Sequence, residues 1–326
     1  MFVLTAHIEI GNYIFKQVHG VTIIKSVDLL SDTAEIELPM SALFGNTEVG
    51  FERKQLEQEI KAGDAVKITL AYKDVIETEE FNGFVRFIKP NVPTVTIECE
   101  DAVYVIRKKQ ITKNFGKTTL LKVLQYIVEG TGVALAGDIP EVIFDKFLLK
   151  NVNGAQALEK IKEEYGLYIF IDDNNNLFAG LRQTKNIGLT QIYNIYENVV
   201  SHDLKFRKAE DVRISLKVIG VLKDNTKIEV IVGDTTGEQR TLYKYNISDK
   251  AALKNIGEAE LSDMKFDGYE GSITSFLTPY ATRGYNAQII DKNYPERTGN
   301  YFIPKVTTTF NTSGARRKVE LGTKVS

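Results

Sequence analysis

The chain has 326 residues, of which 43% are hydrophobic and 26% charged, and its formal net charge is −2. This length can bury a substantial core and accommodates two or three domains. The near-neutral charge does not favour nucleic acid or an anionic membrane as the main partner. A single cysteine, Cys99, excludes an internal disulfide and a cysteine-rich zinc site.

The sequence carries no targeting or spanning signal. No stretch approaches the roughly 20 apolar residues that cross a bilayer, so we expect no membrane-spanning segment. The N-terminal sequence MFVLTAHIEI lacks the basic flank of a signal peptide. We therefore expect a protein that folds in a reducing cytoplasm.

The first 112 residues are predicted to form strands. The segments TAHIEIG, DTAEIELP, AVKITLAY and TVTIECE alternate apolar and polar residues and are separated by turn residues such as PNVP. This pattern is typical of antiparallel strands with one buried face. Cys99 alternates in phase with Val95 and Ile97, so we expect it to be buried and inert. We predict a small, tube-like β-barrel domain over residues 1–112.

The periodicity changes from two to 3.6 residues in the middle of the chain. In TLLKVLQYIVEG, Leu120, Leu124 and Ile127 share one face of a helix that we expect to end at Gly130. A second helix fits NGAQALEKIKEEYG, and LYIFIDDNNNLFAGL predicts a hairpin that turns at DNNN. We therefore predict a compact α+β domain over residues 113–185.

Alternating runs return in VRISLKVIGVL, KIEVIVGD and RTLYKYNI, and one helix with Ser248 or Asp249 as its N-cap interrupts them. The segments FNGFVRFIKP and TVTIECED end the first arm, and GNYFIPKVTTTF and RRKVELG end the last. Both pairs consist of an aromatic strand, a turn and a returning strand. We predict a second tube-like β-barrel domain with one inserted helix over residues 186–326. The predicted fold class is α+β, mainly β, with two small β-barrels flanking the compact α+β domain.

The segment ITKNFGKTTL resembles part of a phosphate-binding loop. A strand-like run, AVYVIRK, precedes Gly116, Lys117 and Thr118, and a helix follows. Such a loop requires a glycine five residues before Gly116, and Ile111 stands there. The later strands do not alternate with helices as a parallel sheet requires. We therefore expect no nucleotide site, and interpret the segment as a polar linker into a helix capped by Thr118 or Thr119.

No other motif indicates a catalytic, cofactor or metal site. DDNNNL begins like a calcium loop, but Leu177 and Gln183 stand where glycine and glutamate are required, so we expect a hairpin turn. The sequence contains no Gly-x-Ser-x-Gly elbow. The histidines fall on different elements without metal-ligand spacing, namely His7, His19 and His202. We assign no catalytic, cofactor-binding or metal residues, and predict that the protein is not an enzyme.

The last sixty residues have a distinctive order of motifs. A Gly-x-Ile strand follows the predicted helix, then a proline and a glycine, an Asp…Pro-Glu-Arg-x-Gly-x-Tyr hairpin, and a final Gly-x-Arg-Arg-x-Val-x-Leu-Gly. The residues are Gly271, Ile273, Pro279, Gly284, Asp291, Pro295, Glu296, Arg297, Gly299, Tyr301, Gly314, Arg316, Arg317, Val319, Leu321 and Gly322. This order resembles the C-terminal signature of the phage tail baseplate hub family, also called late control gene D proteins.

The rest of the chain agrees with this resemblance. DTAEIELP is similar to the family's first hairpin, and FNGFVRFIKPNVPTVTIECEDAVYVIRKK is similar to its Phe-x-Gly-x-Ile…Pro…Ile-x-Cys-Glu-Asp segment. FLLKNVNGAQALEKIKEEYGLYIFIDDNNNLFAGL resembles the middle domain. The chain departs from the family in having no tryptophan and a short middle unit, so contacts to neighbouring tail proteins are expected to differ from those of larger hubs.

The resemblance implies a structural function. It implies a homotrimer whose two barrels per chain form a pseudo-sixfold ring in the baseplate of a virion tail or an injection particle, assembled in the bacterial cytoplasm. Such a ring joins the sixfold tail tube, or a tube-initiator protein, to the threefold central spike. It also lets the tape measure protein and DNA or other cargo pass through its channel.

Two other functions stay open on the residues alone. A carbohydrate-binding or adhesin-like tail protein would suit the β-rich plan and the fifteen tyrosines. A cell-wall hydrolase is the third alternative, because separation in space, not in sequence, decides whether two carboxylates form a glycosidase pair. Some relatives carry an appended hydrolase domain, and we expect none after Ser326, which directly follows the last predicted strand.

Overall fold

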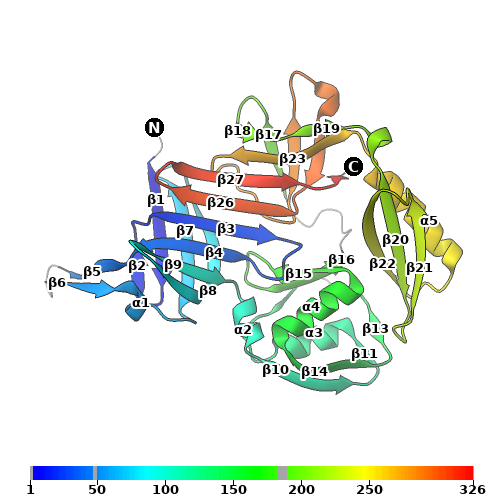
Figure 1. Cartoon of the computed structure of the whole chain (residues 1–326), viewed down its shortest axis with the longest axis horizontal. Coiled ribbons are helices and arrows are strands. Elements are labelled where there is room, and N and C mark those ends of the chain that lie inside the picture. Colours follow the sequence, from blue (N-terminus) through cyan, green and yellow to red (C-terminus); the bar gives the residue numbers. More distant parts are fainter. Residues whose placement is uncertain (1–2, 47–49, 138, 182–188, 326) are drawn as a thin grey trace.

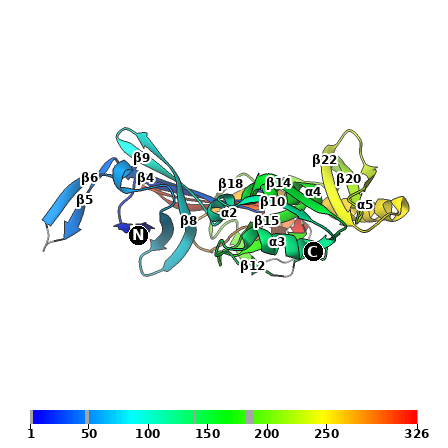
Figure 2. The same ribbon diagram turned by 90° about the horizontal axis from the view of Figure 1, so that it is seen from below.

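The computed structural model describes residues 3–46, 50–137, 139–181 and 189–325. It is mainly β with a few helices, and the chain forms an elongated molecule (Figures 1 and 2). The hairpin β5–β6 projects at one end, and the unit that carries α5 lies at the other (Figure 2). None of the helices in the described residues is long and apolar enough to cross a membrane.

A twelve-stranded sheet dominates the molecule. Its strands follow the order β18-β23-β27-β26-β3-β4-β9-β8-β7-β1-β2, and β19 pairs with β23 beside this path. The strands are β1 Leu4–Ile10, β2 Tyr13–Phe15, β3 Gly20–Ser26, β4 Thr33–Pro39, β7 Ala65–Tyr72, β8 Ile76–Asn91, β9 Thr94–Glu100, β18 Val199–His202, β19 Lys205–Arg207, β23 Gly268–Ser275, β26 Lys305–Asn311 and β27 Gly314–Leu321. The sheet therefore contains strands from both ends of the chain.

The seam between the two β-rich arms is the pairing of β3 with β26. These antiparallel strands pair in register from Lys305 opposite Ser26 to Asn311 opposite Gly20. The expectation of two closed barrels is wrong for the described residues, where the sheet is an open path from β18 to β2. The physical reason lies in β3 and β26, because edges that could close two separate barrels are instead paired with each other.

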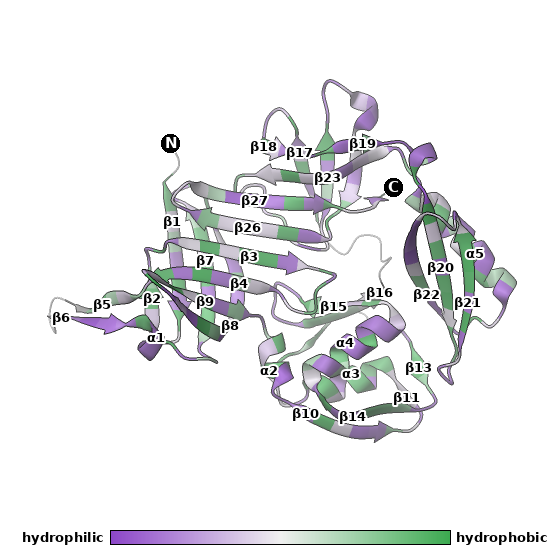
Figure 3. Cartoon of the chain, viewed as in Figure 1, coloured by the Kyte–Doolittle hydropathy of each residue, from purple (hydrophilic) through white to green (hydrophobic). Residues whose placement is uncertain are grey.

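The sheet has one apolar and one polar face, as the alternation predicted. Ile23, Ile36, Ile68 and Ile97 are buried within one hydrophobic cluster. The residues between them along each strand point to the other face, which is why apolar and polar colours alternate along β3 and β4 in Figure 3. Cys99 is buried in the apolar cluster, as expected.

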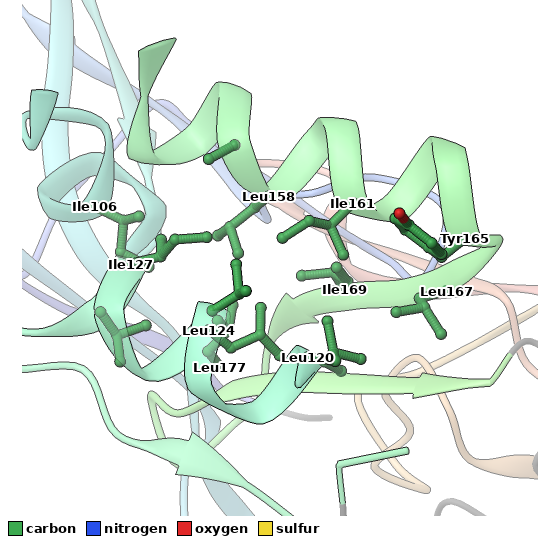
Figure 4. Packing of buried hydrophobic residues seen from close by; sticks show 14 of the residues in the cluster. Ile106, Leu120, Leu124, Ile127, Leu158, Ile161, Tyr165, Leu167, Ile169 and Leu177 are labelled. Atoms are coloured by element: carbon green, nitrogen blue, oxygen red, sulfur yellow. The ribbon is translucent and has the colours of Figure 1, made fainter. Parts of the chain in front are cut away.

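The middle unit packs α3 and α4 against short sheets. The helices are α3 Leu120–Val128 and α4 Gly154–Tyr165, as the periodicity predicted. Figure 4 shows Leu120, Leu124 and Ile127 facing the buried side of α4. The strands are β10 Gln110–Phe115 with β14 Phe147–Asn153, β11 Thr118–Thr119 with β13 Ile143–Phe144, and β12 Leu135–Ala136 with β16 Leu177–Leu181 and β15 Leu167–Ile171.

The remaining elements form three smaller groups. The helix α5 Lys250–Met264 begins at its N-cap Asp249 and packs on β20 and β21. That three-stranded sheet consists of β20 Ile214–Val221, β21 Lys227–Gly233 and β22 Glu238–Tyr245. A four-stranded sheet consists of β17 Thr190–Asn194, β24 Asn286–Ile290, β25 Gly299–Phe302 and β28 Lys324–Val325. The short helices are α1 Leu56–Glu59, η1 Ala209–Asp211 and η2 Pro295–Arg297, and the projecting hairpin is β5 Ser41–Asn46 with β6 Gly50–Gln55.

Two local expectations were wrong. The strand-like run AVYVIRK forms the helix α2 Val103–Arg107, whose first turn donates the Val103 N–H to the Asp101 carboxylate at 2.9 Å. A short apolar run cannot distinguish strand from helix by periodicity alone. The expected polar linker after it is the strand β10, which pairs with β14.

The supposed similarity between the two closing segments is also only partial. FNGFVRFIKP lies within the single strand β8, whereas GNYFIPKVTTTF divides into β25 and β26, which belong to different sheets. The break falls at Ile303 and Pro304, and proline has no N–H to continue a ladder. Both arms nevertheless end in an antiparallel hairpin, β8 with β9 and β26 with β27, so the two segments are equivalent only in that part.

The hydrophobic cores follow the three predicted parts only in outline. One cluster fills the N-terminal arm and also includes Leu277 and Ala315 from the C-terminal arm. The middle-unit cluster includes Ile219 and Val221 from β20. Two further clusters lie within the C-terminal arm. The division into residues 1–112, 113–185 and 186–326 stays a prediction.

Candidate functional site

The Gly116–Thr118 segment lies in the turn between β10 and β11. Thr118 pairs with Phe144, and the Thr119 hydroxyl caps α3 by accepting the Lys122 N–H at 3.4 Å. Ile111 is buried in β10 instead of supplying the flexible first position of a phosphate-binding loop. The absence of a nucleotide site stays a prediction.

The DDNNNL segment forms the expected hairpin turn between β15 and β16. The Asp172 carboxylate accepts the N–H groups of Asn174 and Asn176, each at 2.9 Å. Gln183, the other residue weighed there, lies outside the described residues. Within the described part of the chain, no group of three or more His, Cys, Asp or Glu side chains is arranged to hold a metal ion.

Arg283 is the centre of a buried ionic junction in which the three parts of the chain meet. Its Nη2 lies 2.8 Å from Asp32 Oδ2 in the N-terminal arm, and its Nη1 lies 3.0 Å from Asp173 Oδ1 in the middle unit. It also donates to the Ile171 carbonyl, and its guanidinium lies 4.8 Å from the Phe170 ring centroid. We define the ionic junction as Arg283, Asp32, Asp101, Asp173 and Lys25.

Lys25 and Asp173 supply the second ion pair of the junction. Lys25 Nζ lies 2.9 Å from Asp173 Oδ1, and the Tyr280 hydroxyl donates to Asp173 Oδ2 at 2.9 Å. Burial opposes the charge on Asp173, but the attraction of Lys25 and Arg283 prevails and holds the pKa of that carboxyl well below its usual range. Burial lowers the pKa of Lys25, yet Asp173 and its other neighbours raise it overall. Both groups are therefore ionised at neutral pH.

Asp101 and Asp32 supply the carboxylates on the other side of Arg283. Burial, together with the nearby Asp32, raises the pKa of Asp101 to about 8. Burial also raises the pKa of Asp32 to about 6 against the opposing effect of Arg283. Asp101 accepts the Asp32 N–H at 2.7 Å and the Ser31 hydroxyl at 3.0 Å. The junction therefore contains three carboxyl groups and two cations, and one proton on the Asp32–Asp101 pair balances their charges.

A second buried ion pair crosses between the arms. Arg317, fully buried in β27, pairs with Glu80 of β8 and donates to the Leu277 carbonyl at 3.1 Å. Its guanidinium lies 4.7 Å from the Tyr280 ring centroid. Arg317 is one of the residues in the family-like C-terminal pattern, and in this fold it joins strands far apart in the sequence.

Other residues of that pattern also have structural roles. Gly271 has a φ of +115°, and a Cβ there would lie 2.7 Å from the Asp203 carbonyl oxygen, so only glycine fits. The Tyr301 hydroxyl accepts the Tyr269 N–H at 2.9 Å. Asp291 accepts the Tyr269 hydroxyl at the base of the turn before η2.

The cavity beside the ionic junction is too small for an organic substrate. Its volume is about 70 Å³, and its lining includes Lys25, Asp32, Glu80, Asp101 and Asp173. Ligand pockets have volumes of roughly 300–1,000 Å³, whereas a polar cavity of the smaller size holds water. The junction is therefore suited to fix the positions of three chain segments, not to process a ligand.

The polar face of the twelve-stranded sheet is the other candidate for function. Arg316, Thr309, Thr22, Glu35 and Glu98 lie opposite one another in a row that crosses β27, β26, β3, β4 and β9. This row passes over the seam without interruption. Both arms therefore contribute to one continuous polar face, and Figure 1 shows their strands side by side in one broad sheet.

Comparisons with known proteins identify the fold. No protein-family model and no curated protein sequence matches the chain. The 43 kDa tail protein of prophage MuSo2 from Shewanella oneidensis superposes with a TM-score of 0.65 at 15% identity, over 99% of this chain and 98% of that one. The chain has the fold of a phage tail protein. The tail protein from Neisseria meningitidis MC58 gives a TM-score of 0.64 at 11% identity, over 99% and 97% of the two chains.

The tail-protein fold extends to a secretion system. The E. coli c3393 protein, a component of the type VI secretion system with structural similarity to the T4 tail proteins gp27 and gp5, gives a TM-score of 0.59 at 8% identity. The match covers 96% of this chain and 75% of that protein. These likenesses confirm, at the level of the fold, the resemblance that the C-terminal motifs predicted.

The residues of the ionic junction were missed in the sequence. Asp32 directly precedes β4, Asp101 directly follows β9, and Asp173 lies in the turn after β15, each in a segment that resembles an ordinary turn. Arg283 stands in a loop between β23 and β24, more than a hundred residues from Asp173. The available signal was a charged residue directly after an apolar strand in IECED, which is typical both of a solvated turn and of a buried pair.

Proposed function

We propose that the chain is the structural hub of a phage tail or a phage-tail-like injection machine. Three copies form a ring that adapts the sixfold tail tube to the threefold central spike and encloses part of the central channel. The observation that carries this proposal is the twelve-stranded sheet, which runs through both arms of a chain with the tail-protein fold over its full length.

The open sheet suits a ring of copies. Its end strands, β18 and β2, each have one edge without a partner strand in the described sheet path. Unpaired strand edges favour pairing with another chain, and a closed ring satisfies every repeated interface. Two β-rich arms per chain, residues 1–112 and 186–326, would give six β-rich units in a trimer. Such a trimer can present a sixfold face to a tube and a threefold face to a spike.

The polar face of the sheet is proposed to line the channel. Glu35 and Glu37 of β4 are exposed there, and threonines of β3 and β26 flank them. Carboxylates repel nucleic-acid phosphates, so DNA would pass without binding to the wall. The charge reversal Glu35→Lys with Glu37→Lys is expected to leave assembly intact and to lower DNA delivery about tenfold through attraction of the phosphates. The matched control, Glu210→Lys with Glu258→Lys on distant exposed sites, is expected to have no effect.

The partners of such a hub are structural. They are the other two copies, the central spike, the tail tube or its initiator, and the tape measure protein, with DNA or cargo in transit. The ionic junction supports a non-enzymatic role, because its charges fix segments of the chain relative to one another and its cavity of about 70 Å³ is too small for an organic substrate. The site of action is the baseplate of a virion or an injection particle.

The deciding experiment is the copy number and symmetry of the chain in an assembled particle imaged by electron microscopy. Three copies on the tail axis, between tube and spike, are expected. Six copies on the axis would contradict the adapter. An off-axis position on a fibre would instead favour a carbohydrate-binding adhesin. Solution mass alone is a weaker test, because a spike or tube protein can template the ring.

A further inference from the structure

One segment of the chain is strongly basic although the whole chain is slightly acidic. Residues 107–122 contain six Lys and Arg residues and no Asp or Glu, whereas the whole chain has a formal net charge of −2. Arg107 forms a salt bridge with the buried Glu100. Lys113, Lys117 and Lys122 are exposed and make no salt bridge to a carboxylate in the described part of the chain.

Two of these lysines lie on elements that meet at one aromatic ring. Lys113 lies on β10 with its Nζ 5.6 Å from the Tyr126 ring centroid, and Lys122 lies one helical turn before Tyr126 on α3. Phe115 packs edge-on against the same ring, with centroids 5.4 Å apart. Lys117 stands in the turn between the two elements. We define the basic surface as Lys113, Lys117 and Lys122 with Phe115 and Tyr126.

Lys109 extends the positive charge but has a separate structural role. Its Nζ donates to the Tyr126 carbonyl and, at 2.7 Å, to the Glu129 carbonyl at the C-terminal end of α3. Cations at this position satisfy the last carbonyls of a helix. Within the described residues, Lys113, Lys117 and Lys122 donate to no comparable helix carbonyl, and Lys113 lies over the Tyr126 ring.

We propose that the basic surface binds the phosphate backbone of a nucleic acid. Lysine ammonium groups are point charges that suit phosphates, and the half-buried Phe115 and Tyr126 rings lie beside them. The charges follow a strand, a turn and a helix and thus form an extended surface, which matches an extended polyanion. A helical acidic peptide would instead require an apolar groove. The polar face of the large sheet, proposed to repel DNA, and this basic surface belong to different parts of the chain, so the proposal is independent of the hub.

The test is the binding of the full chain to labelled duplex and single-stranded DNA as sodium chloride increases. Each phosphate contact contributes about −0.9 to the slope of log K against log salt for duplex DNA. The slope is therefore expected to be about −3 to −4 for three or four lysines. Lys113→Gln, Lys117→Gln and Lys122→Gln together are expected to lower affinity at low salt at least about tenfold and to remove about three units of slope. Each single substitution removes about one unit.

The matched control removes three exposed lysines elsewhere, with Lys208→Gln, Lys250→Gln and Lys254→Gln, and is expected to change neither affinity nor slope. Thermal unfolding checks that the triple variant is folded. If it is not, the slope of the Lys117→Gln variant, which is altered only in a turn, tests the proposal instead. The proposal is overturned by three results: no DNA binding at low salt, an equal loss in the control, or tighter binding to poly-glutamate or to phosphatidylserine vesicles than to DNA.

Discussion

Two places in this molecule join segments that are far apart in the sequence, and they do so by different physics. At the seam, β3 and β26 pair along seven positions through backbone hydrogen bonds and an apolar face. At the ionic junction, the buried Arg283 joins the buried Asp32 to the partly exposed Asp173 through ion pairs. Apolar burial has no preferred partner and no dependence on pH. Buried charges require particular partners and a particular protonation state. The seam therefore holds the two arms together, whereas the junction fixes the relative positions of the segments that it joins.

The largest expected effect is that of Arg283→Ala. The substitution leaves the buried Asp32 without its cation and removes one of the two cations that pair with the partly exposed Asp173, which costs roughly 3–5 kcal/mol of the free energy of unfolding. Urea denaturation measures this loss. The matched control is Arg213→Ala, an exposed arginine 3.9 Å from Asp234, whose removal is expected to cost at most about 0.5 kcal/mol. A small effect of Arg283→Ala would mean that the junction does not hold the three segments together.

The seam is tested by Ile23→Ala, for which we expect a loss of roughly 3 kcal/mol. Ile23 is 1% exposed on the apolar face of β3, so truncation removes buried surface and leaves a cavity. Its neighbour Ile24 is only partly buried on the opposite face of the same strand, and Ile24→Ala is expected to cost less than half as much. Equal losses at the two positions would contradict the assignment of faces. The loss from Ile23→Ala is expected to be the same at pH 5 and pH 8, because no titratable group is altered.

The strands and their buried faces could be predicted from the sequence, but the pairing of distant strands could not. The alternation in DTAEIELP and AVKITLAY predicted strands with Ile36 and Ile68 on one buried face, because the period of a strand depends only on neighbouring residues. The same local information cannot specify which strand edges pair. The β3–β26 seam joins residues nearly 300 positions apart in the sequence, and two closed barrels were predicted in its place.

The ionic junction could not be predicted from the sequence for a related reason. Charged residues such as Asp32 and Arg283 are usually solvated, and only the packing of three separate segments makes them buried. The turn at Asp173 was predicted as a turn, yet its function in the fold comes from Lys25 and Arg283, which no local pattern connects to it. The C-terminal motif order, by contrast, predicted the tail-protein fold, because whole-chain resemblance carries the long-range information that local periodicity lacks.

The pH dependence of stability distinguishes the junction from the seam. The raised pKa values of Asp101, about 8, and Asp32, about 6, mean that the folded protein holds a proton that the unfolded chain releases near pH 4. The free energy of unfolding is therefore expected to fall as pH rises from about 4 to about 8. The lowered pKa of Asp173 acts oppositely and reduces stability only below about pH 4. Stability should thus be greatest in mildly acidic solution.

The variant Asp101→Asn tests the origin of this slope. The substitution removes the titrating group, so the fall in stability between pH 5 and pH 8 is expected to shrink by more than about 1 kcal/mol, since one pKa unit corresponds to 1.36 kcal/mol. The variant is less stable overall, because Asp101 also accepts hydrogen bonds from Asp32 and Val103. The measurement is therefore the change of the free energy of unfolding with pH, not the denaturation midpoint at a single pH. An unchanged slope would show that the pair does not hold the proton.

The smallest expected effect is the reactivity of Cys99 in the native protein. The thiol is 2% exposed on β9, where it lies opposite Ala34 and Val85, and burial raises its pKa far above the usual range. Since the thiolate is the reactive form, a thiol reagent is expected to label the native chain only as fast as the sheet opens. Labelling in urea should be complete and provides the reference.

Cys99 lies two residues from Asp101, so its labelling rate also reports whether the junction and the seam open together. If Ile23→Ala accelerates labelling and Arg283→Ala does not, the sheet opens at the seam while the junction is closed. Equal acceleration by both variants would mean that the seam and the ionic junction open as one unit. Rapid labelling of the unaltered protein would contradict the buried position of the thiol.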